Sequence, residues 1–336
     1  MAEEIFRSER TGDGAEFLQI HPLDSRYPVK TFFTARSGGC STGNFSSLNM
    51  GFSTGDDRAD VAENRRRIFD FIGKPGYCEA VPHQVHRAEI ACIRADEGGL
   101  RSSGGGDPDG IVQEESQAGE KRACKLSFPD TDALITDAKN VILTSLHADC
   151  IPVWLYDPER HAAGLVHAGW RGTRADIAAK TARKMCAEFG SALEDLLAFI
   201  GPGISRCCFE VAAEVAEEFA AMLGTEVFYG ENGRYSIDDK NGKFHLDLKK
   251  INERLLQRCL LYTSLFKPVF GGRAALIEIL AVPHTGKVHH HTGRAGLYGA
   301  FPAGRRSGHP LEGYQADRRR RDSGGLFRCA GRPVSL

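Results

Sequence analysis

Hydrophobic positions along this chain recur with two different periods, which predict two kinds of element. Four segments place an apolar residue at every third or fourth position, the pattern of a helix that buries one face. These predicted helices cover residues 60–72, 176–189, 212–223 and 246–260. Between them lie short, unbroken apolar runs of the kind found in buried strands. The predicted strands cover residues 17–20, 30–34, 132–136, 141–146, 151–156, 162–166 and 196–200, with more expected around a turn within 81–93.

Two stretches break this pattern. Residues 95–130 are rich in Gly, Ser, Asp and Glu, so we expect a surface loop or an insertion there. Residues 266–336 show no apolar stripe that could bury a face. We therefore predict an N-terminal extension at 1–29, one main domain at 30–265 and an atypical, basic, poorly ordered tail at 266–336. A shifted reading frame, a foreign joined end and a basic interaction tail are alternative explanations of that tail.

Charge and composition exclude several classes of protein. The 336 residues include 43 basic and 44 acidic side chains, so bulk charge gives no reason to expect a nucleic-acid or membrane partner. Only the arginine run at 318–321 keeps nucleic-acid binding as a minor alternative. No apolar run is long enough to span a membrane, and the first residues lack the apolar core of a signal peptide. We expect a cytoplasmic protein.

The cysteines fit that expectation. Ten are present at irregular spacings, and without a secretion signal we expect them to be reduced. Cys207 and Cys208 are adjacent, and we do not expect them to bridge each other.

Candidate metal ligands lie at the ends of predicted strands. Cys150 precedes one strand and His167 follows another, so a rigid scaffold can direct both side chains to one point. Each residue alone is more often structural, and a metal site needs a third ligand. His86 is the candidate, in the proline-led segment 81–86. We expect this segment to be a strand with His83 and His86 on one face, so that His83 points into the same cavity as His86.

Two glycine-bearing turns are candidate anion sites. One runs from Arg36 through Gly38 and Gly39, where several backbone amides could face an anion, although a plain flexible loop has the same composition. The other follows His167 and holds Arg171, Gly172 and Thr173 at a strand–turn–helix junction.

These candidates fall within a set of motifs that resembles a known family. The motifs are TARSGGCSTGNFSSLNMG at 34–51, GDDRADVAENRRRI at 55–68, HQVH at 83–86, DALITD at 132–137, ADCIPV at 148–153, HAGWRGT at 167–173 and IGPGISRCCFEV at 200–211. Together they resemble the YfiH-type laccase-domain, or multicopper polyphenol oxidase-like, family, regarded as zinc-dependent purine nucleoside phosphorylases. The family's usual closing segment is not matched after about residue 260.

The resemblance implies a fold and a metal site. The implied fold is α+β, with mixed β-sheets layered with helices as an α/β/β/α sandwich. The implied ligands are His86, Cys150 and His167. Two imidazoles and one thiolate leave a fourth tetrahedral position open, as in catalytic zinc sites. We expect Zn²⁺, with Cu²⁺ as the alternative.

The resemblance also implies an activity. The expected reactions are phosphorolysis of adenosine, inosine and S-methyl-5'-thioadenosine, with adenosine deamination as a second activity. Purine nucleosides and phosphate are then the partners, and the oligomeric state stays open. Cys150 and His83 are the expected catalytic residues, His83 as a general acid/base or phosphate contact or, equally, as an orienting group. Phosphate would bind at Arg36 or Arg171. A copper-dependent polyphenol oxidase and a non-enzymatic zinc-binding module are the alternatives.

Overall fold

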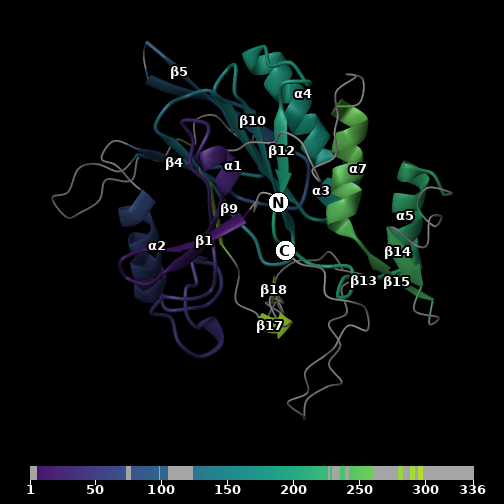
Figure 1. The fold of residues 1–336 in the computed structure, drawn as a ribbon, viewed down its shortest axis with the longest axis horizontal. Coiled ribbons are helices and arrows are strands. Elements are labelled where there is room, and N and C mark those ends of the chain that lie inside the picture. The colour runs from purple at the N-terminus through teal and green to yellow at the C-terminus, as the bar shows by residue number, and fades with distance from the viewer. Residues whose placement is uncertain are drawn as a thin grey trace.

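The protein is represented by a computed structural model that describes most of the chain as far as residue 260. It describes residues 6–72, 77–97, 99–104, 124–225, 228, 235–238 and 242–260, and the backbone of 279–282, 288–291 and 294–297. Two large sheets form the centre (Figure 1). The first, in spatial order, is β1 (Phe6–Arg10), β2 (Glu16–Ile20), β3 (Phe32–Thr34), β16 (Ile279–Val282), β9 (Val141–Leu146), β4 (Cys78–Pro82) and β7 (Cys124–Phe128). The second is β12 (Leu197–Ile200), β10 (Ile151–Asp157), β11 (Ala162–Ala168), β8 (Ala133–Thr136), β5 (Ile90–Asp96) and β6 (Gly99–Ser103).

Helices and two small sheets complete the described structure. The main helices are α2 (Arg58–Ile72), α4 (Ile177–Phe189), α5 (Ala213–Leu223) and α7 (Leu248–Leu260). Shorter helical turns are α1 (His21–Asp24), the 3-10 turn η1 (Gly43–Phe45) and α3 (Trp170–Arg174). The small sheets are β13 (Glu210–Ala212), β15 (Lys243–Leu246) and β14 (Ser236–Asp238), and the hairpin of β17 (Val288–His291) and β18 (Arg294–Leu297). The predicted helices at 60–72, 176–189, 212–223 and 246–260 are confirmed within two residues at each end.

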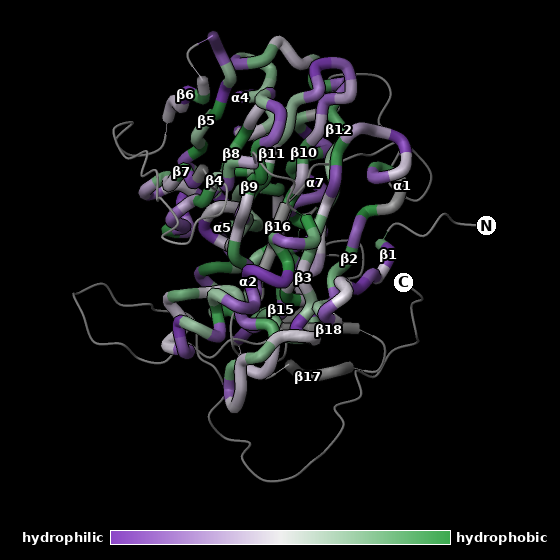
Figure 2. Tube along the Cα trace, turned by 90° about the vertical axis from the view of Figure 1, so that its left-hand side faces the viewer, coloured by the Kyte–Doolittle hydropathy of each residue, from purple (hydrophilic) through white to green (hydrophobic). Residues whose placement is uncertain are grey.

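Three apolar layers hold four layers of secondary structure together. One layer joins α2 to the seven-stranded sheet, through residues such as Ile68 and Ile142. A second fills the space between the two sheets, where Leu143 and Trp154 belong to one cluster. A third joins the six-stranded sheet to α4 and α7, with Val153 and Ile251 among its members. The predicted α/β/β/α sandwich is confirmed, and the green strands at the centre of Figure 2 show its hydrophobic interior.

Strands that are buried on both faces explain the unbroken apolar runs of the sequence. Along β10, Ile151, Val153 and Leu155 face the helices, whereas Trp154 and Tyr156 face the other sheet. Successive side chains of a strand point to opposite faces, so both sets must be apolar when both faces are covered.

The parallel part of the seven-stranded sheet determines where a site can form. Strands β3, β16, β9, β4 and β7 are parallel neighbours, so their carboxyl ends lie along one edge. Four of these strands are followed by described segments. The segments after β3, β4, β7 and β9 begin at this edge, at residues 35, 83, 129 and 147. Ligands of open parallel sheets bind at the carboxyl edge. Most candidate residues of the sequence lie in these segments.

The predicted domain boundaries differ from the structure at three places. Residues 6–20 form a hairpin whose second strand pairs with β3, so part of the expected 1–29 extension belongs to the sheet. The expected 95–130 loop contains strands at both ends, β6 and β7, while 105–123 lie outside the described residues. Strand β16 pairs in parallel with both β3 and β9, so the tail prediction is wrong at 279–282. The Ile279–Val282 run is apolar, as an interior strand requires.

One cysteine departs from the expected reduced state. Cys78 is buried on β4 and is disulfide-bonded. Its register partner across β4 and β7 is Cys124. The described cysteines that remain thiols are Cys40, Cys92, Cys150, Cys186, Cys207, Cys208 and Cys259.

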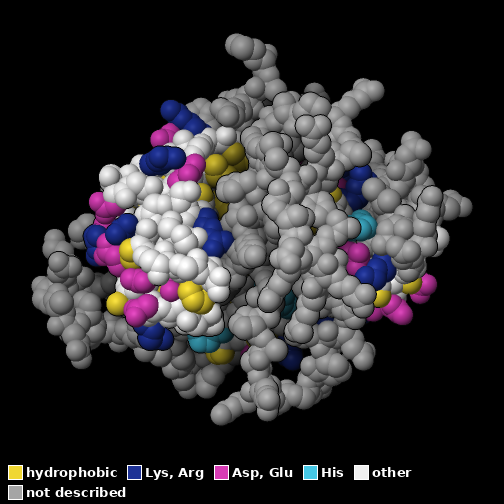
Figure 3. Space-filling view, turned by 90° about the horizontal axis from the view of Figure 1, so that it is seen from below, with side chains coloured by type: hydrophobic (Ala, Val, Ile, Leu, Met, Phe, Trp, Pro, Cys, Tyr) yellow, Lys and Arg dark blue, Asp and Glu magenta, His cyan; other side chains and the backbone are white. Residues whose placement is uncertain are grey.

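Charged side chains of both signs are interspersed on the described surface in Figure 3, and apolar side chains are scattered between them. This agrees with the balanced charge of the sequence. In the part of the chain that the structure describes, no helix is both long and apolar enough to cross a membrane.

The position of β16 gives a test of the domain boundary. A chain that ends after residue 265 lacks the strand between β3 and β9, so we expect it to lose the cooperative thermal unfolding of the full chain. A chain that ends after residue 300 keeps β16 and should retain that transition. Circular dichroism melting of both chains checks this, and a sharp, unshifted transition in the shorter chain would contradict the assigned strand.

Candidate metal centre

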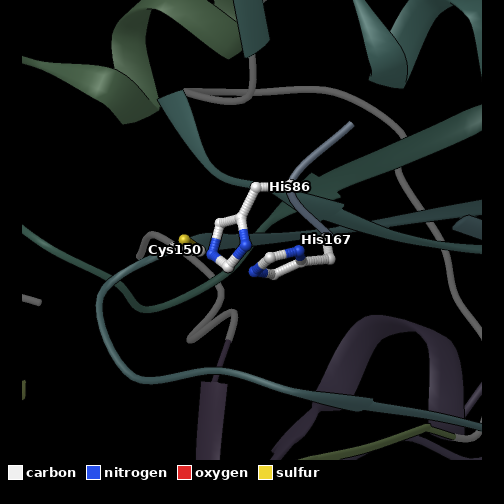
Figure 4. Close-up of side chains that lie close together, drawn as sticks. All are labelled: His86, Cys150 and His167. Carbon is white, nitrogen blue, oxygen red and sulfur yellow. The ribbon is translucent and has the colours of Figure 1, made fainter. Parts of the chain in front are cut away.

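Three potential metal ligands converge beside the carboxyl edge of the seven-stranded sheet. One ligand atom from each of His86, Cys150 and His167 lies within 4.8 Å of the other two (Figure 4). His86 comes from the segment after β4, Cys150 from the segment after β9, and His167 from β11. The imidazoles of His86 and His167 lie edge to face, with ring centroids 4.8 Å apart.

His167 reaches the centre because of its position on β11. It shares one strand face with Ala163 and Leu165, which belong to the apolar layer between the sheets. Its neighbour across the ladder is Asp132, just before β8, whose carbonyl accepts the His167 amide at 2.8 Å. On the same face, the Nδ1 of His167 lies 2.9 Å from Oδ1 of Asp132. This contact leaves Nε2 of the ring as the atom able to bind a metal.

Asp132 also fixes the segment that carries His86. Its Oδ1 accepts the amide of His86 at 2.9 Å, and its Oδ2 accepts the amides of Arg87 at 2.8 Å and Val85 at 3.3 Å. His86 has a φ of 60°, in the left-handed region that non-glycine residues rarely occupy. The three amides therefore fold around a single buried carboxylate. One side chain thus places two of the three ligands.

Cys150 lies at the start of β10, and its position is fixed from two sides. The carbonyl of Cys150 lies 3.2 Å from Nδ1 of His147, and the His147 ring packs 5.2 Å from that of His167. On the other side, the amide of Ile204 donates to the carbonyl of Asp149 at 2.8 Å. Cys150 as a residue is partly exposed, as is His86, whereas His167 is buried.

Charges at the centre stabilise one another. Burial alone raises the pKa of the Cys150 thiol, but the charge of His167 and hydrogen bonds from His167 and His86 outweigh it and lower that pKa to about 6. Burial also opposes the charged form of His167, yet Cys150 and Asp132 raise the pKa of His167 to about 9. The pKa of Asp132 is lowered, because hydrogen bonds from His167 and from two amides outweigh its burial. At neutral pH Cys150 is a thiolate, the form that binds metals.

Gly169 leaves the space that two ligands occupy. A Cβ at this position would lie 2.9 Å from Sγ of Cys150 and 3.0 Å from Cδ2 of His86. Side chains with a Cβ would therefore displace the ligands, although the backbone of Gly169 itself is extended.

The donor set fits a metal ion. Tetrahedral zinc sites take imidazole nitrogen at about 2.0–2.1 Å and thiolate sulfur at about 2.3 Å, so ligand atoms lie several ångströms apart, as these do. Copper accepts the same donor types. Asp132 orients the His167 imidazole, as carboxylates commonly do for histidines that bind metals. The expected convergence of His86, Cys150 and His167 is thus found in the structure.

His83 does not join these residues. It lies beyond the end of β4 with an exposed side chain, and it is not in the group of converging ligands. The expectation that His83 and His86 share a strand face is wrong, because Val81–Pro82 ends the strand and the two histidines are three positions apart.

In the predicted anion loop at Arg36, the hydrogen-bond donors are already bonded to other groups of the protein. The guanidinium of Arg36 donates to the backbone carbonyls of Asn44, at 2.8 Å, and Ser46. The amide of Gly39 donates to Ser47, and that of Cys40 to Asn64. A Cβ at Gly38 or Gly39 would collide with backbone at 2.0 Å, so these glycines serve close packing. These amides do not form the open cradle that the sequence suggested.

The residues of the second predicted anion site have different environments in the structure. Gly172 and Thr173 are buried. A Cβ at Gly172 would lie 3.0 Å from the carbonyl of Arg87, and the hydroxyl of Thr173 accepts the amide of Asn252 at 2.9 Å. Both therefore pack α3 against its neighbours. Arg171 is exposed, with its guanidinium 4.3 Å from the centroid of the Trp170 ring.

Asp132 and Gly169 are the residues that sequence reasoning missed. Asp132 begins the DALITD motif, directly before a predicted strand, so an acidic residue at a strand end was the available signal. Gly169 stands two residues after His167, where its role depends on side chains distant in sequence.

Comparison with known proteins assigns the chain to a family. The sequence family described as multi-copper polyphenol oxidoreductase laccase matches residues 30–264, and the chain belongs to this family. The chain is 33% identical over 240 residues to the purine nucleoside phosphorylase of Bacteroides thetaiotaomicron, covering 70% of this chain and 78% of that protein. It is 26% identical over 242 residues to adenosine deaminase RL5 from an unknown prokaryotic organism, covering 71% and 83%.

The fold of the chain is also similar to a solved structure. The crystal structure of the hypothetical protein YfiH from Bacillus licheniformis superposes with a TM-score of 0.59 at 25% identity, covering 84% of this chain and 90% of that one. The resemblance to the YfiH-type laccase-domain family is confirmed.

Replacing Asp132 tests its role in placing the ligands. Asp132→Asn removes the charge and one oxygen that accepts amide hydrogens, so we expect metal affinity to fall about 10- to 100-fold. Competition with a chromophoric chelator measures this. The control is Asp130→Asn, which removes an exposed carboxylate at a φ of 49°, a conformation that asparagine tolerates. Equal affinities in both variants would show that Asp132 does not position the ligands.

Replacing Gly169 tests the space around the ligands. Gly169→Ala should lose most of its bound metal after dialysis, because the new methyl group would lie 2.9 Å from Sγ of Cys150 and 3.0 Å from Cδ2 of His86 and would push both side chains away. Gly12→Ala is the matched control, since nothing lies within 4 Å of a Cβ there. Elemental analysis compares the two, and wild-type metal content in Gly169→Ala would contradict the packing described.

Proposed function

We propose that this chain is a zinc-dependent purine nucleoside phosphorylase. It acts on adenosine, inosine and S-methyl-5'-thioadenosine, and adenosine deamination is its second activity. The observation that carries this proposal is the centre of two imidazoles and one thiolate, in which His86 and Cys150 are partly exposed. A metal held there keeps a position accessible to a substrate, unlike a closed structural site. The relative named purine nucleoside phosphorylase supports the choice of reaction.

His86, Cys150 and His167 would hold the metal. When bound, zinc would supply Lewis acidity and lower the pKa of a coordinated water, which suits deamination. The chain's own residues hold the metal ligands in position. Asp132 holds both histidines, and a buried, charge-assisted hydrogen bond of this kind resists reorientation.

Phosphorolysis requires a phosphate group beside the nucleoside. A phosphate oxygen forms a bond to C1′ of the ribose, the bond from C1′ to the purine nitrogen breaks, and the base leaves with a proton. Arg171 is proposed to bind the phosphate, since its exposed guanidinium lies four residues after His167 and rests on Trp170. His83, exposed on the segment that carries His86, is proposed to deliver the proton.

The two alternative functions are a copper-dependent phenol oxidase and a non-enzymatic zinc-binding module. A copper-dependent phenol oxidase of the multicopper type needs a blue-copper site and a separate histidine cluster. Within the described ranges, only His86, Cys150 and His167 form a potential metal group. A non-enzymatic zinc-binding module would have the same centre, and only an activity assay separates it from an enzyme.

The test is chromatographic. Purified, metal-loaded protein is incubated with adenosine, with and without phosphate, and the purines are separated. We expect adenine only when phosphate is present, and inosine in both conditions. Cys150→Ala should abolish all products together with the bound metal. Metal-loaded protein that produces no purine from any of the three nucleosides would contradict the proposal.

Two variants assign the roles of individual residues. Arg171→Ala should reduce adenine release more than inosine formation, because only phosphorolysis uses phosphate. Arg174→Ala is its control on the same helix, where Arg174 pairs with Glu218 at 2.5 Å. His83→Asn should slow base release without changing the metal content. Equal loss of both activities in Arg171→Ala would indicate a structural role for that residue.

A further inference from the structure

Two thiols lie side by side on a turn that the proposed reaction does not use. Cys207 and Cys208 follow β12 and precede β13, and their Sγ atoms are 3.0 Å apart. Both are thiols; Cys207 is exposed and Cys208 is partly buried. Adjacent cysteines commonly turn their side chains apart, since successive residues of an extended chain face opposite ways. Here the turn brings both sulfurs together.

The turn is anchored on several sides. The amides of Cys208 and Phe209 both donate to the carbonyl of Ser205, at 2.9 and 3.1 Å, and Phe209 is buried. The amide of Ile204 is bonded to Asp149. Lys249 reaches the turn from α7, where its Nζ donates to the hydroxyl of Ser205 at 3.1 Å and to the carbonyl of Gly203 at 3.3 Å. The sulfurs are therefore held close without further ordering of the chain.

We propose that Cys207 and Cys208 form an oxidation site at which a hydroperoxide converts the two thiols into a vicinal disulfide. The juxtaposition of an accessible and a shielded thiol matches the attacking and resolving cysteines of reversible oxidation sites. The sequence alone argued against a bridge between adjacent residues. The 3.0 Å separation of the sulfurs changes that argument, since the two atoms already lie within about 1 Å of the 2.05 Å length of a disulfide bond.

The chemistry is balanced with hydrogen peroxide as the oxidant. The exposed Cys207 thiolate attacks one peroxide oxygen, an S–O bond forms, the O–O bond breaks, and one water leaves after proton transfer. The Cys208 sulfur then attacks the Cys207 sulfur, the S–S bond forms, the S–O bond breaks, and a second water leaves. Two thiols lose two electrons, and the peroxide gains them. Adjacent Cα atoms lie about 3.8 Å apart. This is below the usual spacing of about 4.4–6.8 Å, so external thiols should reopen the bridge.

Other described thiols are less suited to this reaction. Cys92 and Cys259 are buried, and burial raises the pKa of both. Burial also raises the pKa of Cys40 and Cys186. Cys150 is a reactive thiolate, but it belongs to the metal centre and lies on a different tryptic peptide.

Mass spectrometry of the full chain tests the proposal directly. Trypsin cuts after Arg206 and next after Arg234, so the two cysteines lie alone on one peptide. After brief treatment with hydrogen peroxide and then iodoacetamide, we expect this peptide to lack two hydrogens and to carry no alkyl group. Dithiothreitol should restore two alkylation sites. A peptide that still takes up two alkyl groups, while other cysteine peptides are oxidised, would overturn the proposal.

Variants separate the two roles. In Cys208→Ser, the sulfenic acid of Cys207 has no resolving thiol, so dimedone should label it, whereas the wild-type peptide should stay unlabelled. In Cys207→Ser, oxidation of Cys208 should be severalfold slower because that thiol is partly buried. Cys186→Ser is the matched control and should leave formation of the bridge unchanged. Equal dimedone labelling of the wild-type protein and Cys208→Ser would contradict the assignment of a resolving cysteine.

Discussion

The carboxylate of Asp132 is the interaction on which the metal centre depends. It is buried, and it accepts the amides of Val85, His86 and Arg87 while contacting the ring of His167. Hydrogen bonds to a charged group contribute about 1.5–3 kcal/mol each. A buried carboxylate without them would be strongly destabilising, so the fold around Asp132 can adopt few other arrangements. The left-handed backbone of His86 is one consequence, because the amides must turn toward the carboxylate.

The layers of the fold bring the remaining ligand to the same place. The segments after β4, β9 and β7 leave one edge of the parallel sheet and cross toward the second sheet, which supplies His167. Strand β16 lies between β3 and β9, so the order of strands along this edge depends on a segment far along the chain. Gly169 then leaves the space that Cys150 and His86 occupy. The centre is thus a product of sheet topology and one buried charge.

Local sequence patterns predicted the elements well and their mutual contacts poorly. The helices and most strands followed from periodicity and apolar runs, and the three ligands from motif and residue type. Asp132 was missed because its partners lie 35 to 47 positions away in sequence. The open anion loop was wrong because Gly39 and Cys40 donate to side chains that fold back from later segments. Strand β16 was missed because the basic, glycine-rich composition of the later residues was extended to 266–336 as a whole, although an apolar run at 274–282, broken only by Glu278, contains the strand.

The central claim is that His86, Cys150 and His167 bind one zinc ion that the reaction uses. Anomalous X-ray diffraction from crystals of the purified protein, recorded just above and just below the zinc absorption edge, tests it most directly. The account predicts one strong peak above the edge, at about 2.0–2.1 Å from two imidazole nitrogens and about 2.3 Å from the Cys150 sulfur, which disappears below the edge. A peak that persists below the zinc edge and above the copper edge would contradict zinc. A zinc peak elsewhere, with none among these three residues, would contradict the centre itself.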